Sequence, residues 1–79
     1  MNFVMSALYN FNILFSLDDF SEYGDGYLVT LGIVTPVSKR TFTDIALLIS
    51  MLERKYSTVE FDSFNESEFT LYLAGGDDN

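Results

Sequence analysis

The sequence contains no cysteine and no histidine. Without cysteine, the chain can form no disulfide framework, no thiolate zinc site and no thiol nucleophile. Without histidine, it lacks the commonest general base and the commonest metal ligand. A reducing, cytoplasmic compartment is compatible with this composition, and we expect the protein to be located there.

Basic residues are scarce as well, with 4 Lys and Arg against 12 Asp and Glu and a formal net charge of −8. Four basic side chains cannot form a patch that neutralises phosphates, so we expect no direct binding to nucleic acid. The acidic surplus has two interpretations. It can be a surface that keeps a small protein in solution, or it can complement a partner that is itself basic.

Long apolar segments are also missing. No run approaches the ~18 apolar residues of a membrane-spanning helix, so we expect no membrane association. The first eight residues are apolar but carry no basic group and no small-residue cleavage site, and we do not expect a signal peptide. The length of 79 residues predicts a single domain, 1–79, with an ordered core at about 9–74 and a flexible acidic tail at 75–79.

The clearest periodic segment predicts an α-helix over residues 43–56. Its apolar residues fall on one helical face: Ile45, Leu48, Ile49, Leu52 and Tyr56. Thr43 is a candidate N-cap. Asp44 in the first turn and Arg54 and Lys55 in the last turn suit the helix dipole. A helix of this length has little stability alone, so it needs a surface on which to pack.

Two strands are predicted before this helix. Residues 9–17 alternate between apolar and polar, and residues 27–34 are rich in β-branched and aromatic side chains, with a turn at 18–26 between them. The alternation of the first strand extends back to Phe3. A strand of that length would span ~50 Å, so we expect a break, a bend or a helical start near residues 6–9.

The pairing of these strands is constrained by their apolar faces. The apolar residues of both strands have odd numbers. They lie on the same side of the sheet only if the numbers of two paired residues sum to an even value, as in a hairpin centred near Gly24 or Glu22. The single proline, Pro36, closes the second strand because it has no N–H to donate to a neighbour.

A second hairpin is predicted after the helix, with a three- or five-residue loop around Glu66. Its inward-facing residues are Val59, Phe61, Phe69, Leu71 and Leu73. The expected cross-strand pairs are Phe61 with Leu71, Val59 with Leu73, Glu60 with Tyr72, and Asp62 with Thr70.

Together these segments predict an α+β fold of order β-β-α-β-β, in which a four-stranded antiparallel sheet carries one helix packed on one face. On the first hairpin the opposite face would expose Leu14, Phe20, Leu28 and Val34. Such a patch often marks an interface, and a homodimer is one candidate for it. Alternatively, residues 1–8 fold back over the patch.

No motif for catalysis, a cofactor or a metal is present. Asp18 and Asp19 lie near Glu22 and Asp25, but their spacing does not match the calcium-binding loop of an EF-hand. Serine and tyrosine hydroxyls lack a histidine base to activate them, and the segment 24–26 is not followed by the residues of a phosphate-binding loop. We therefore expect no enzymatic activity, no cofactor and no metal.

The distribution of acidic residues is the most informative feature for function. They form two groups, one on the turn of each hairpin or beside it, and each group has a tyrosine within it. Tyrosine mixed with carboxylates suits a surface that binds arginine and lysine. The alternative is an ordinary solvated face whose acids keep sheet edges from pairing. The candidate partner-binding residues are Asp18, Asp19, Glu22, Tyr23, Asp25, Glu60, Asp62, Glu66, Glu68 and Tyr72.

In its size, acidity, lack of cysteine and α+β pattern, the chain resembles the small phage-encoded inhibitors of bacterial defence. These include anti-CRISPR proteins and DNA-mimicking antirestriction proteins. The resemblance implies that the chain occupies a basic, nucleic-acid-binding surface of a defence effector, in the cytoplasm of the host cell. A charge of −8 is modest for a DNA mimic. Two other classes stay open, an immunity or antitoxin-type protein that masks a basic toxin, and a structural homo-oligomeric module.

Overall fold

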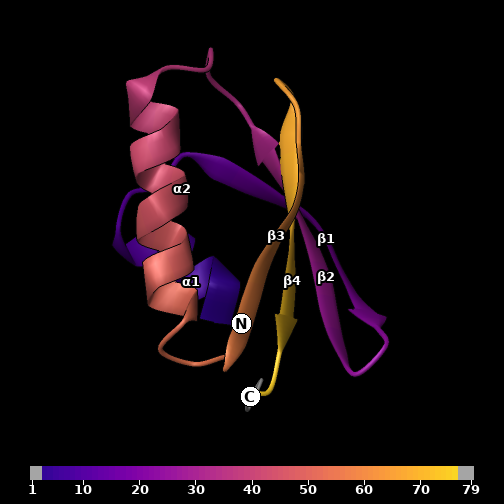
Figure 1. Ribbon diagram of the computed structural model, residues 1–79. Coiled ribbons are helices and arrows are strands. Elements are labelled where there is room, and N and C mark those ends of the chain that lie inside the picture. Colours follow the sequence, from indigo (N-terminus) through magenta and orange to yellow (C-terminus); the bar gives the residue numbers. More distant parts are fainter. Residues whose placement is uncertain (1–2, 77–79) are drawn as a thin grey trace.

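The computed structural model describes residues 3–76 of the chain. Two helices and four strands lie along these residues, and each helix is followed by two strands, as shown in Figure 1. In chain order they are α1 (Phe3–Asn10), β1 (Phe15–Tyr23), β2 (Gly26–Ile33), α2 (Lys39–Leu52), β3 (Thr58–Phe64) and β4 (Glu68–Ala74).

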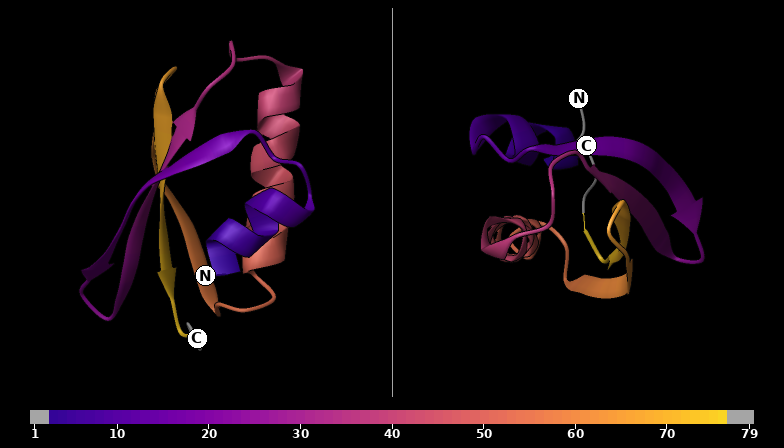
Figure 2. Two further views of the ribbon diagram at one scale, coloured as in Figure 1. Left: turned by 180° about the vertical axis from the view of Figure 1, so that it is seen from behind. Right: turned by 90° about the horizontal axis from the view of Figure 1, so that it is seen from above.

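The strands form one antiparallel sheet in the order β1-β2-β4-β3, so β2 and β4 are central and β1 and β3 are the edges. This confirms the predicted α+β class and the four-stranded antiparallel sheet. The prediction of a single helix was wrong, because a second helix, α1, precedes the first hairpin. Both helices lie on the same side of the sheet, as the right-hand view of Figure 2 shows. The opposite face of the sheet, here named the outer face, is covered by no helix of residues 3–76.

Helix α1 covers the residues near 6–9 where a break, a bend or a helical start was expected, and it rules out the alternative in which residues 1–8 fold back over the outer face. Its last two residues were predicted to begin the first strand, which starts only at Phe15. Val4, Ala7 and Leu8 recur at helical spacing and are buried. The helix ends where Asn12 adopts φ +57°. The N–H of Asn12 donates to the carbonyl of Tyr9, and the N–H of Ile13 to that of Leu8 at 3.0 Å, which is a Schellman motif. The break in the apolar alternation therefore lies after residue 10 and not at 6–9.

Helix α2 begins four residues earlier than predicted because Ser38 is its N-cap. The Ser38 hydroxyl accepts a hydrogen bond from the N–H of Arg40 at 3.2 Å, and Thr41 Oγ1 accepts one from the N–H of Ser38 at 3.0 Å. The prediction that Thr43 is the N-cap was wrong. It lies inside the helix, where its hydroxyl donates to the carbonyl of Lys39.

The end of α2 also differs from the predicted range of 43–56. The helix ends at Leu52, and Arg54 and Lys55 follow it instead of forming its last turn. The chain then turns so that the N–H of Tyr56 donates to the carbonyl of Leu52 at 2.9 Å. The predicted apolar face is confirmed, since buried residues include Ile45, Leu48, Leu52 and Tyr56.

Strand β1 extends through most of the predicted turn, leaving a two-residue loop of Gly24 and Asp25. Gly24 has φ +58°, as the first loop residue of a type II′ turn requires. Such a loop makes the numbers of paired residues sum to an odd value, so the expected even register is wrong beside the turn. A bulge at Asp18 changes the register, and the pairs from Leu17 to Phe15 sum to an even value.

The second hairpin follows the prediction more closely. Three residues, 65–67, lie between the strands, although the last cross-strand pair, Phe64 with Phe69, encloses four. The predicted pairs of Val59, Glu60 and Phe61 with β4 are confirmed. The predicted pairing of Asp62 with Thr70 was wrong, because a second bulge places Ser63 opposite Thr70.

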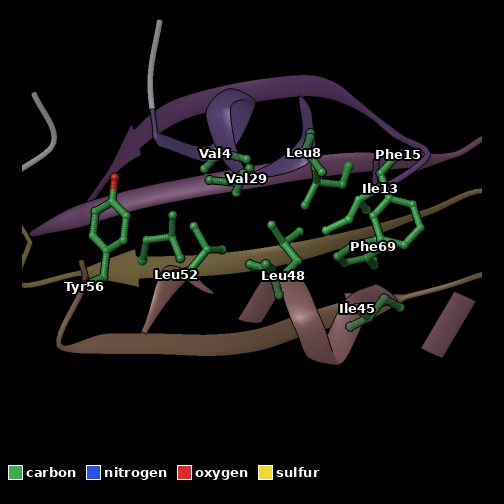
Figure 3. Close-up of a cluster of buried hydrophobic side chains, with 14 residues drawn as sticks. Val4, Leu8, Ile13, Phe15, Val29, Ile45, Leu48, Leu52, Tyr56 and Phe69 are labelled. Atoms are coloured by element: carbon green, nitrogen blue, oxygen red, sulfur yellow. The ribbon is translucent and has the colours of Figure 1, made fainter. Parts of the chain in front are cut away.

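The hydrophobic core lies between the two helices and the sheet. Figure 3 shows Val4 and Leu8 of α1 and Leu48 and Leu52 of α2 pointing toward the strands, with Tyr56 at one end of the cluster. The remaining core residues come mainly from the strands: Ala7, Ile13, Phe15, Val29, Leu31, Ile45, Phe69, Leu71 and Leu73.

Two further predictions concern the C-terminal tail and the membrane. Most of the expected flexible tail, residues 77–79, lies outside it. Within residues 3–76, neither helix has the length and apolar character needed to cross a membrane.

Candidate functional site

The outer face is built from cross-strand rows. Paired residues share a face of the sheet, and successive residues along a strand alternate between faces. Because Val29, Leu31, Leu71 and Leu73 pack in the core, the residues between them belong to the outer face. Its rows are Tyr23–Gly26–Ala74–Thr58, Ser21–Leu28–Tyr72–Glu60 and Asp19–Thr30–Thr70–Ser63, with Ser16, Gly32 and Glu68 beyond them.

Asp18 joins this face through its bulge. A Cβ atom on Gly32 would collide with the side chains of both Ser16 and Asp18, so these side chains lie over the glycine. The Ser16 hydroxyl donates to Asp18 Oδ1 at 2.8 Å and holds the carboxylate in this position. Since Glu68 is the partner of Gly32 on the other side, Asp18 and Glu68 bring acidic groups from both hairpins together.

The structure thus assembles six of the predicted partner-binding residues on one face: Asp18, Asp19, Tyr23, Glu60, Glu68 and Tyr72. The other four lie elsewhere. Glu22 shares the inner face with Tyr27, and Asp25 lies in the first turn. Glu66 lies in the second turn, at the opposite end of the sheet, and Asp62 stands in the bulge of β3. The two acidic groups expected from the sequence are therefore regrouped by strand register.

Two tyrosines meet across the outer face. The rings of Tyr23 and Tyr72 lie edge to face with their centroids 6.1 Å apart. Tyr23 is on the edge strand β1, and its row continues through Gly26 and Ala74, whose side chains are absent or small. This lets the Tyr23 ring lie across the sheet to reach Tyr72. Glu60 is the direct cross-strand partner of Tyr72, so an aromatic pair and a carboxylate adjoin each other.

Charge is strongly segregated in this protein. The two hairpins, residues 15–33 and 58–74, contain eight acidic residues and no lysine or arginine. All 4 basic residues fall on α2 or directly after it: Lys39, Arg40, Arg54 and Lys55. The helices cover the inner face, so the charged residues of the outer face are all acidic and the basic side chains belong to the opposite layer of the molecule.

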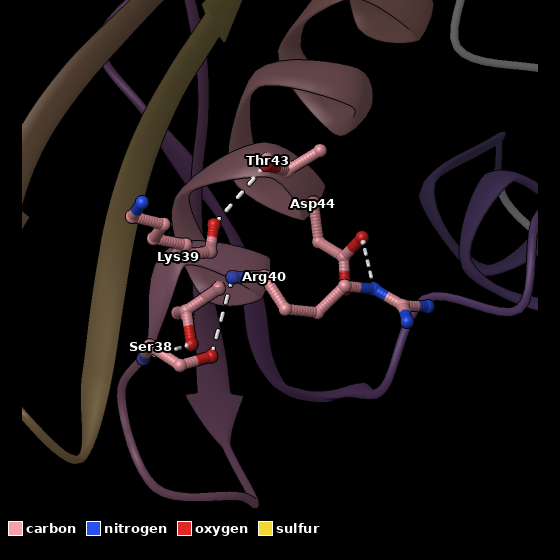
Figure 4. A network of polar contacts seen from close by, with 6 residues as sticks. Ser38, Lys39, Arg40, Thr43 and Asp44 are labelled. Atoms are coloured by element: carbon pink, nitrogen blue, oxygen red, sulfur yellow. Dashed lines mark hydrogen bonds and ion pairs between the residues drawn. The ribbon is translucent and has the colours of Figure 1, made fainter.

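The first turn of α2 neutralises part of its own basic charge. Arg40 Nε lies 3.1 Å from both carboxylate oxygens of Asp44, one helical turn later, and Figure 4 shows this pair beside the Ser38 cap. The Asp44 side chain is only 11% exposed, while that of Arg40 is 69% exposed. Asp44 is thus a structural acid of the helix and does not contribute to the outer face.

An aromatic patch that the sequence did not predict lies beside the start of α2. Phe42, Phe61 and Phe64 are 53%, 46% and 39% exposed, and Phe64 contacts both of the others. Phe61 was expected to be inward-facing. It does share the inner face with Leu71, but β3 is an edge strand, so the ring is covered on one side only. Its position on an edge could not be read from alternation alone.

The predicted apolar patch of the first hairpin does not form on the outer face. The bulge turns Phe20 to the inner side opposite Val29, where it packs on Tyr27. Leu28 remains on the outer face and is half-buried. Leu14 and Val34 are exposed, but they lie beyond the ends of β1 and β2. A hollow between α1 and the start of β1 is lined by residues that include Met5, Leu8, Tyr9, Ile13 and Leu14.

Within residues 3–76, no three acidic side chains come close enough together to hold a metal ion. The outer face thus presents carboxylates and tyrosines that are spread over the sheet. Comparisons with protein-family models, with curated proteins and with solved structures found no match.

Proposed function

We propose that this chain is a small, non-enzymatic inhibitor that binds the basic, nucleic-acid-binding surface of a bacterial defence effector and thereby keeps nucleic acid away from it. The proposal extends the resemblance to anti-CRISPR and antirestriction proteins. Its main support is the outer face, where Asp18, Asp19, Glu60 and Glu68 lie together and the surrounding strands hold no basic residue.

The physical basis is electrostatic complementarity. A surface that binds phosphates through lysine and arginine attracts a rigid array of carboxylates in the same way. The backbone hydrogen bonds of the sheet fix the spacing of these acids before binding, so only their side chains need to be ordered when the complex forms. The protein acts in the host cytoplasm in this proposal, where effector and nucleic acid meet.

The experiment is a competition assay on a panel of purified bacterial defence nucleases and RNA-guided effector subunits. Each is mixed with its labelled nucleic acid and then titrated with this protein. We expect one effector to release its nucleic acid as a stoichiometric complex forms. The outer-face variant Asp19→Lys, Glu60→Lys, Glu68→Lys should lose this effect.

A matched control carries the same change of charge away from the outer face: Glu22→Lys, Asp25→Lys, Glu66→Lys. These side chains are exposed, so both variants should keep the fold. Displacement should survive in the control because these side chains lie on the inner face or in the turns and do not belong to the rows of the outer face. No displacement of nucleic acid from any effector, or equal losses in the two variants, would contradict the proposal.

A second candidate, the homo-oligomeric module, is favoured by the exposed aromatic patch of Phe42, Phe61 and Phe64. Sedimentation equilibrium of the wild type and of Phe61→Ser, Phe64→Ser tests it. A dimer that the substitutions dissociate would support a structural role, and a monomer at all concentrations would leave the inhibitor as the better proposal.

A further inference from the structure

The outer face contains one place where the side chains match a particular cation rather than positive charge in general. It consists of Tyr72, its cross-strand partner Glu60, and Tyr23, whose ring lies 6.1 Å from that of Tyr72. Leu28 flanks Tyr72 on the other side. We propose that this place binds an arginine side chain of the basic partner, and that the protein discriminates arginine from lysine there.

The geometry of the rings supports this assignment. The two tyrosines are edge to face, with 80° between their planes, so at least one ring keeps a face that the other does not cover. Tyr23 is 61% exposed, and Tyr72 is half-buried among the strands. A planar guanidinium can stack on such a face, and it loses less hydration than an ammonium group when it does so.

Glu60 supplies the second half of the match. Cross-strand neighbours have Cβ atoms about 5 Å apart, so the Glu60 carboxylate can meet a cation that lies on the Tyr72 ring. A guanidinium can donate two parallel N–H groups to one carboxylate while its plane rests on the ring. A lysine ammonium can satisfy the charge of Glu60 but cannot form this forked contact.

The surroundings favour a cation and no other occupant. The outer-face row next to Tyr72 ends in Asp19, and Asp18 and Glu68 lie beyond it. The hairpins that form this face have no lysine or arginine, so no internal cation competes for the place. This inference rests on the proposed function, since it names the side chain of the basic partner that the outer face binds.

The test uses two capped eight-residue peptides, one of arginine and one of lysine, titrated into the full chain at the same ionic strength. Binding is followed by NMR, with the Tyr23 and Tyr72 ring signals as local probes. We expect the arginine peptide to bind about five-fold more tightly and to shift both rings. Equal affinities, or failure of both peptides to bind, would overturn the inference.

Substitutions localise the preference. Tyr72→Leu keeps an apolar side chain at a half-buried position but removes the ring, and it should abolish the preference for arginine while leaving lysine binding nearly unchanged. Tyr72→Phe retains the ring and should retain the preference. Tyr9→Leu is the matched control, because Tyr9 is 82% exposed on α1, on the other side of the sheet.

The outcomes separate this inference from the proposed function. If the Asp19, Glu60 and Glu68 reversals abolish binding of both peptides but Tyr72→Leu leaves the preference intact, the arginine site is wrong and the acidic binding face stands. If both peptides bind the charge-reversed variant as tightly as they bind the wild type, both proposals fail. A preference that disappears equally in Tyr9→Leu also overturns the site.

Discussion

Single residues decide where the chain of this protein can turn. Asn12 ends α1 with a left-handed backbone, and Gly24 opens the first hairpin with a positive φ. Glycine adopts a positive φ at low cost because it has no Cβ to approach the next carbonyl oxygen, and the short polar side chain of asparagine can hydrogen-bond locally in the left-handed region. The two positions therefore set the length of α1 and the tightness of the β1–β2 turn.

Gly24→Ala is expected to destabilise the protein by about 1 kcal/mol. A Cβ at this position would meet no atom within 4 Å, so the cost arises from the φ of +58° alone and not from a clash. Thermal or urea unfolding followed by far-UV circular dichroism measures the effect. Asp25→Ala is the control and should cost less, because Asp25 is the second loop residue and is not among the residues with positive φ. Equal stability of the glycine and alanine proteins would show that the turn has another conformation.

At the scale of elements, α2 depends on the sheet for its stability. Leu48 and Leu52 are fully buried between the helix and the strands. Leu47, on the same helix, is 37% exposed. This contrast separates the contribution of packing from that of helix propensity, which is the same for a leucine in either position.

Leu52→Ala is expected to lower the free energy of unfolding by about 2–5 kcal/mol, since it removes apolar contacts and leaves a cavity. Leu47→Ala should cost much less. Both are measured by urea denaturation. A loss below about 0.5 kcal/mol for Leu52→Ala would mean that the helix packs against the sheet in another way.

The bulge at Asp18 gives a second prediction at this scale. Deleting Asp18 should preserve the fold, because it removes the extra residue and leaves Leu17 opposite Leu31 and Phe20 opposite Val29. Deleting Ser21 should abolish cooperative unfolding. The chain would then have to place Asp19 on the inner face, where Phe20 now lies, and an unpaired carboxylate in that position is costly.

Circular dichroism melts of the two deletion variants test this argument. They have the same length and differ only in which residue is missing, so loop length and chain entropy cancel. If both melt alike, the bulge does not control the register.

At the scale of the whole molecule, the dominant feature is the separation of acidic hairpins from basic residues on and after α2. Acids gathered on the outer face repel one another, and Asp18 and Glu68 do so from opposite sides of Gly32. A surface maintained against this repulsion is consistent with a partner whose charge relieves it.

Added sodium chloride should therefore stabilise the free protein, because screening weakens the repulsion. The outer-face variant Asp19→Asn, Glu60→Gln, Glu68→Gln should gain a few tenths of a kcal/mol per neutralised group at low salt and respond less to salt. Urea denaturation at several salt concentrations measures both effects. The variant Glu22→Gln, Asp25→Asn, Glu66→Gln should change less, and a wild type indifferent to salt would contradict the argument.

The features that the sequence by itself determined are those with local causes. The period of Ile45, Leu48 and Leu52 identified α2 and its buried face, and the alternation around Phe61 and Leu71 identified the second hairpin with most of its register. Hydrophobic spacing needs no knowledge of distant residues, because it follows from the helical and extended repeats of the backbone. The cap at Ser38 and the helical spacing of Val4, Ala7 and Leu8 are also local signals, but stronger apolar patterns in the neighbouring residues mask them.

Only the tertiary structure decided which residues share the outer face. Two bulges shift the register of β1 and β3, and the order of the strands makes β2 and β4 the neighbours that bring the two hairpins together. These choices depend on contacts between residues far apart in the chain, which no local pattern records. For this reason the sequence could name Asp18, Glu60 and Tyr72 as candidates, whereas their assembly into one surface, without Glu22, Asp25 and Glu66, required the packed sheet.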